Sequence, residues 1–124
     1  MATTRASATK RKPAEGSAGS GNSRVDERVL EDLLAAMQQA VEGDFGVKLR
    51  ARRADIVGDL QRTFNALQER NAALSRELAR VGRVVGREGR MTERASLGAA
   101  EGAWADSIDA VNTLIDDLIR PSTE

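Results

Sequence analysis

Residues 55–85, DIVGDLQRTFNALQERNAALSRELARVGRVV, carry a nearly unbroken apolar repeat at alternating spacings of three and four. A straight helix repeats every 3.6 residues, so a sustained spacing of 3.5 is typical of a helix supercoiled around a partner helix. We call its members the heptad core positions: Val57, Leu60, Phe64, Leu67, Asn71, Leu74, Leu78, Val81 and Val85. They predict a long helix over about 55–85 that pairs with a second copy of the chain.

One heptad core position is polar. Asn71 falls at an a position, where a buried amide lowers stability but fixes the register and favours parallel pairing of two chains. We therefore expect Asn71 to face the same residue of a second copy; a solvated position near a splayed end is the alternative. Gly58 lies inside the same helix and weakens it by about 1 kcal/mol. It favours either alternate packings of the helix or the close approach of a neighbouring backbone.

Two further helices flank the central one. The first is predicted over 25–42 and ends at Gly43, since glycine commonly follows a helix end. The last is predicted over 102–119 and ends before Pro121, which lacks the amide donor that a continuing helix needs. Connectors over about 43–54 and 86–101 join the three helices, so the predicted fold class is all-α. The last helix adds five core positions at spacings of four and three: Trp104, Ile108, Val111, Ile115 and Leu118.

Composition restricts the chemistry of the chain. Cysteine and histidine are absent, which excludes disulfides, thiolate or imidazole metal ligands and histidine catalysis. We therefore predict no catalytic, cofactor-binding or metal-binding residues. No apolar run approaches 18 residues and no secretory signal is present, so a cytoplasmic protein is expected. Residues 1–24 are rich in Ala, Ser, Gly and basic residues, and they are predicted to form a disordered tail.

The arrangement of helix, glycine, connector and helix occurs twice, with an offset of 46 to 47 residues. Residues 25–75 form the first predicted unit and residues 76–124 the second, and the long central helix is shared between them. Phe64-Asn65 corresponds to Val111-Asn112 under this offset. The connectors are expected to dock on the helices through these residues: Gly43, Phe45, Val47, Leu49, Gly89 and Met91.

The first unit resembles the HAMP signalling domain. The resemblance rests on Gly43-Asp44 after the first helix, on the spaced apolar residues of the connector, and on DIVGDL at 55–60, which is similar to the family's D-E-I-G-E-L. Phe64-Asn65 matches the family's F-N. Ile56 departs from the family because a glutamate is usual there, and a proline common in the first helix is missing. That missing proline fits a domain with no attached transmembrane helix.

The second unit resembles the divergent partner in poly-HAMP arrays. The runs VGRVVGREGRMTERA (81–95) and VNTLIDDLIRPSTE (111–124) are similar to the amino-terminal arrays of soluble group III hybrid histidine kinases. This resemblance implies a homodimer that forms a parallel four-helix bundle and relays conformational signals in a two-component system. It also implies further HAMP units and a kinase core downstream, and no catalysis by this chain. No membrane or small-molecule partner is expected. The alternatives are a structural coiled-coil dimerisation adaptor and a nucleic-acid-binding protein with a basic tail.

Overall fold

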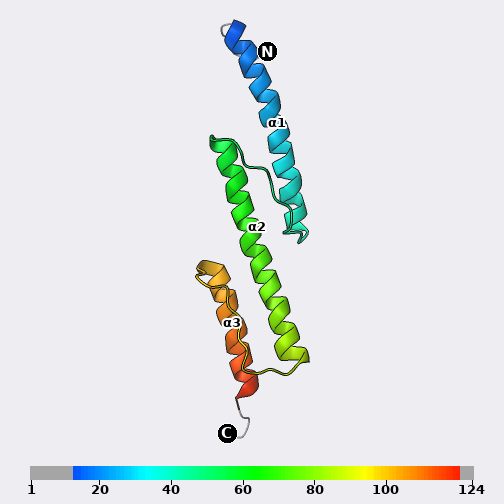
Figure 1. The fold of residues 1–124 in the computed structure, drawn as a ribbon, viewed down its shortest axis with the longest axis vertical. Coiled ribbons are helices and arrows are strands. Elements are labelled where there is room, and N and C mark those ends of the chain that lie inside the picture. The colour runs from blue at the N-terminus through cyan, green and yellow to red at the C-terminus, as the bar shows by residue number, and fades with distance from the viewer. Residues whose placement is uncertain (1–12, 121–124) are drawn as a thin grey trace. The chain divides into compact units, whose positions relative to one another are not determined.

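The structure is a computed structural model that describes residues 13–120, with side chains described from residue 27 onward. In this part of the chain the helices are α1 (Pro13–Val41), α2 (Ile56–Val81) and α3 (Gly102–Ile119). A π-helical turn, η1 (Gly82–Arg87), directly follows α2. Figure 1 shows these elements and the two extended connectors between them. The described residues contain no strand, which confirms the all-α prediction.

The predicted helix bounds agree with the structure at most ends. The last helix covers residues 102–119 in both, and the central helix continues through η1 to Arg87. The main difference is the start of α1, because this helix begins at Pro13 instead of residue 25. Proline suits a first helical position, where its missing N–H would have no partner in the helix. The predicted disordered tail is therefore helical from residue 13 onward, and residues 1–12 lie outside the described part.

The chain divides into two compact units within α2, between Asn65 and Ala66. The sequence repeat predicts this boundary ten residues later, between residues 75 and 76. The core of unit 1 consists of Leu33, Ala36 and Phe64, and the connector residues Val47 and Leu49 pack against it. Since a buried aliphatic or aromatic side chain contributes roughly 1.5–3 kcal/mol, even this small cluster ties the connector to both helices.

Unit 2 repeats this plan with different residues. Its core brings together α2, η1, the second connector and α3, with Ala95 as the buried connector residue. In each unit the connector returns along the first helix, so the second helix runs in the same direction as the first (Figure 1). The side chains of this core are Val81, Val85, Ala95, Ile108 and Ile115, with Leu74, Leu97 and Val111 packed against them.

Glycines in the left-handed region end the helices that precede the connectors. Gly43 has φ of 95° and follows α1, and Gly89 has φ of 72° and follows η1. At the first of these ends, Gly43 N–H donates to the carbonyl of Ala40 and Asp44 N–H donates to that of Gln39. This pair of hydrogen bonds is a Schellman motif, which satisfies carbonyls left open at the end of α1. Gly43 thus fixes where the first connector begins.

The heptad core positions and the five core positions of α3 fall into three groups within the single chain. Val57, Phe64, Val81, Val85, Ile108 and Ile115 are buried; Asn71, Leu74, Trp104 and Val111 are half-buried; and Leu60, Leu67, Leu78 and Leu118 are exposed. Two glutamines next to exposed leucines are buried instead, Gln61 and Gln68. The Oε1 atom of Gln61 has no hydrogen-bond partner among the described residues. The 3.5-residue period therefore marks the apolar side of α2. It does not distinguish the positions that other residues of the chain bury from the positions that stay exposed to solvent.

Candidate functional site

Asn65 binds the first connector through both of its amide atoms. Its Oδ1 accepts the backbone N–H of Leu49 at 2.8 Å, and its Nδ2 donates to the carbonyl of the same residue at 2.7 Å. An extended segment that is not part of a sheet leaves such backbone groups without partners, and unpaired groups cost free energy when water is excluded. The side chain of Asn65 therefore pairs with the backbone N–H and carbonyl of Leu49, as a neighbouring strand would in a sheet.

Asn112 makes the same contact in unit 2. Its Oδ1 accepts the N–H of Ala95 at 2.8 Å, and its Nδ2 donates to the Ala95 carbonyl at 3.0 Å. The two asparagines lie 47 residues apart, and the connector residues that they bind lie 46 apart. We call these two contacts the asparagine clamps. They place Ala95 in the position that Leu49 occupies in unit 1, so the repeat seen in the sequence is also a repeat of side-chain geometry.

Asp55 and Gly58 set the start of α2. The Oδ1 of Asp55 accepts the N–H of Gly58 at 3.1 Å, which is the hydrogen bond of an N-cap. Arg53 donates to both oxygens of the same carboxylate, the shortest contact being 2.6 Å. A Cβ atom on Gly58 would lie 2.0 Å from the carbonyl oxygen of Arg53. Of the two interpretations of Gly58, the structure therefore supports close approach of the connector backbone.

The cap makes the stability of the chain depend on pH in acid. The hydrogen bonds from Arg53, followed by that from Gly58, lower the pKa of Asp55 from 3.8 to about 2. Because the folded-state pKa is depressed, the contribution of Asp55 is fully present well above the unfolded-state pKa of 3.8 and is lost as the pH falls through about 2. We expect Asp55→Asn to be less stable than the parent at pH 6, and most of this difference should disappear by pH 2 in urea unfolding. A difference between the two proteins that is unchanged with pH would contradict this role of the carboxylate.

The second connector is also held by a charged network on α2. The guanidinium of Arg80 donates to both oxygens of Glu77, to Glu93 at 3.0 Å and to the carbonyl of Arg94 at 2.8 Å. Glu77 in turn accepts the N–H of Ser96 at 2.8 Å. The hydrogen bonds from Arg80 lower the pKa of Glu77, and Glu77 and Glu93 raise the pKa of Arg80. The network fixes the connector at three successive points, residues 93, 94 and 96.

Arg94 links the same connector to α3. It donates to Oδ1 of Asp116 at 2.6 Å and to the carbonyls of Met91 and Glu93. This ion pair is partly exposed, and such pairs contribute only about 0–1 kcal/mol. The buried contacts around Ala95 are therefore the stronger attachment to α3.

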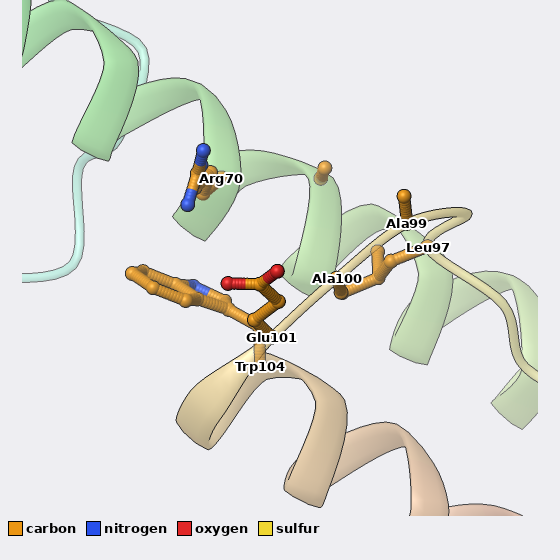
Figure 2. Close-up of a pocket in the computed structure, with 7 residues that line it drawn as sticks. Arg70, Leu97, Ala99, Ala100, Glu101 and Trp104 are labelled. Atoms are coloured by element: carbon orange, nitrogen blue, oxygen red, sulfur yellow. The ribbon is translucent and has the colours of Figure 1, made fainter.

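Trp104 completes unit 2 at the start of α3. Its Nε1 donates to Oδ1 of Asn71 on α2 at 3.1 Å, and the guanidinium carbon of Arg70 lies 5.5 Å from the centre of the indole ring. Figure 2 shows Arg70 above Trp104, with the connector residues Ala99 to Glu101 beside them. They border a cavity of about 200 Å³. Asn71 thus has a partner within its own chain, which the sequence pattern did not predict.

The structure separates the predicted connector residues. Phe45, Val47 and Leu49 are half-buried, whereas Met91 is 41% exposed. Met91 is thus not the docking residue that its position in the repeat predicts, because the asparagine clamp selects Ala95, four residues later. Sequence reasoning aligned Asn65 with Asn112 but assigned neither of them a role. The signal was an asparagine recurring at a fixed distance behind each connector.

No family model matches the chain, and no solved structure matches it. Within residues 13–120, no helix combines the length and the apolar composition needed to cross a membrane. The same part of the chain contains no group of three or more acidic, histidine or cysteine side chains arranged to hold a metal ion. The geometry of the connectors is therefore the basis for a functional proposal.

Proposed function

We propose that this chain is a tandem HAMP relay module that carries conformational signals toward a histidine kinase core. The observation that carries the proposal is the duplicated asparagine clamp, which ties an extended connector to the second helix of each unit. A relay needs a segment whose docking can change without unfolding the helices. A connector held by a few hydrogen bonds and one or two apolar residues has this property. The proposed module is cytoplasmic and has no catalytic activity of its own.

The proposed partner is a second copy of the chain, paired in parallel to form four-helix bundles. In unit 1, α1 has a stripe of exposed apolar residues at spacings of four and three, beside its buried residues Leu33 and Ala36. Leu60 on α2 is exposed as well. Exposed apolar stripes of this kind are typical of helix–helix interfaces. The stripe consists of Leu30, Leu34, Met37 and Val41.

The chain is therefore expected to be a dimer at micromolar concentration, as measured by light scattering. Leu34→Glu together with Leu60→Glu should shift it to a monomer, because each change places a charge in the apolar interface. Gln38→Glu, at an exposed polar position of the same helix, is the matched control and should leave the dimer intact. A parent chain that remains a folded monomer would refute the proposed bundle.

The relay and the structural adaptor differ in what happens when the clamp is broken. We would fuse the chain to a histidine kinase core and measure autophosphorylation of the parent and of Asn112→Leu, after light scattering has shown that both are dimers. A relay predicts a changed phosphorylation rate, because the docking of the second connector is altered while the dimer persists. An unchanged rate in a dimeric protein would favour the adaptor.

A further inference from the structure

The apolar repeat of α2 does not by itself fix where α3 docks along it. Apolar residues recur on α2 every three or four positions, so a shift of α3 by one heptad would again set apolar residues against apolar residues. A contact that occurs at only one place along α2 is needed to select one register.

We propose that the hydrogen bond between Trp104 and Asn71 selects the register of α3 on α2 within one chain. The indole N–H can only donate a hydrogen bond, so it needs an acceptor on another residue. Asn71 is the only polar heptad core position on α2, and its Oδ1 accepts this hydrogen bond. A shift of one heptad would set Trp104 against Leu78 or Phe64. Neither side chain accepts a hydrogen bond, so the half-buried N–H would lose its partner.

The remaining direct contacts of α3 are less selective, and the network of Arg80 and Glu77 holds the connector, not α3 itself, on α2. The asparagine clamp joins Asn112 to backbone atoms of Ala95, and every connector residue offers the same backbone groups. The pair between Arg94 and Asp116 is partly exposed. The N-cap residue of α3, Glu101, makes no side-chain cap hydrogen bond, unlike Asp55 at the start of α2. Trp104 therefore provides a side-chain-specific contact at the end of α3 that lacks a cap.

The surroundings of the indole ring indicate that polar contacts hold it in place more than close packing by neighbouring side chains does. The cavity beside Trp104 is bordered by the small side chains of Ala73, Ala99 and Ala100, and Arg70 lies over one face of the ring (Figure 2). Packing on that side is incomplete, so the hydrogen bond to Asn71 determines the position of the ring. This gives Asn71 a register function between two helices of one chain, independent of any second copy.

Spin-label distance measurements test the proposal. Ser75→Cys on α2 and Asp106→Cys on α3 are exposed sites, and the chain has no other cysteine. Labelled chains are diluted with unlabelled chains so that only distances within one chain remain. We expect one distance in the parent, and a second, clearly resolved distance in Asn71→Leu and in Trp104→Phe, since a shift of seven helical residues slides α3 by about 10 Å along α2.

Matched variants separate the possible outcomes. Asn71→Asp keeps an acceptor oxygen and should retain the single distance, and Trp104→Phe keeps an aromatic ring below Arg70 but removes the N–H donor together with the five-membered ring that carries it. If Asn71→Leu loses its helical circular dichroism, Trp104→Phe alone decides the test. One unchanged distance in Trp104→Phe would overturn the proposal. A second distance in Asn112→Leu but not in Trp104→Phe would assign the register to the asparagine clamp instead.

Discussion

Gly58→Ala is expected to lower the free energy of unfolding by about 2 kcal/mol or more, the cost of forcing extra volume into a closed site. The added Cβ would lie 2.0 Å from the carbonyl oxygen and 2.7 Å from the carbonyl carbon of Arg53. Both are backbone atoms, so the clash cannot be relieved by rotating a side chain. Either the connector leaves α2 or the first turn of α2 unwinds. Urea unfolding followed by circular dichroism measures the change.

Gly82→Ala is the control for this effect. A Cβ atom at Gly82 would meet nothing within 4 Å, so the same substitution should there raise stability, by up to about 1 kcal/mol, through helix propensity alone. Opposite signs at the two glycines would show that contact with the connector, and not glycine itself, determines the outcome. A neutral or stabilising Gly58→Ala would mean that the connector does not approach α2 as closely as described.

Asn65→Leu is expected to cost about 3 kcal/mol, because it leaves a part-buried N–H and a part-buried carbonyl of Leu49 without partners. Leucine is close to asparagine in size, so the change tests hydrogen bonding more than packing. The first connector should exchange its amide hydrogens much faster, while the amides of α1 and α2 stay protected. Hydrogen exchange followed by mass spectrometry measures both regions in one experiment.

Asn65→Asp separates the two halves of the clamp. A carboxylate accepts the N–H of Leu49 but cannot donate to its carbonyl, so an intermediate loss of stability is expected. If Asn65→Leu costs less than about 0.5 kcal/mol, water replaces the amide in the clamp, and the connector is not held by this residue.

The sequence predicted the helices better than their contacts. Apolar spacing and the flanking glycine and proline were enough to place α3 at residues 102–119, since these signals are local. The start of α1 was missed because the sequence Ser23-Arg24-Val25-Asp26 has the S-x-x-D form that is typical of a helix start, yet it lies inside a helix that begins earlier, at Pro13. Local signals compete at helix starts, and the sequence alone does not rank them.

The side-chain contacts could not be predicted in the same way, because they depend on which face of each helix is covered by other parts of the same chain. The heptad pattern treats Leu60 and Phe64 alike, yet the first is 44% exposed and the second 7%. Likewise, a polar residue at an a position suggests pairing between copies, and the pattern gives no information about a tryptophan 33 residues away that binds Asn71. Such distant contacts require the path of the connector, which has no periodicity to predict it.

The location of Trp104 has a practical consequence for studying how the chain unfolds. It is the only tryptophan, there is no tyrosine, and it lies in unit 2. Intrinsic fluorescence therefore follows the unfolding of unit 2 alone, whereas circular dichroism follows all the helices. If the two signals are lost at the same denaturant concentration, the units unfold as one cooperative body; if they are lost at different concentrations, the chain passes through a species with one unit folded.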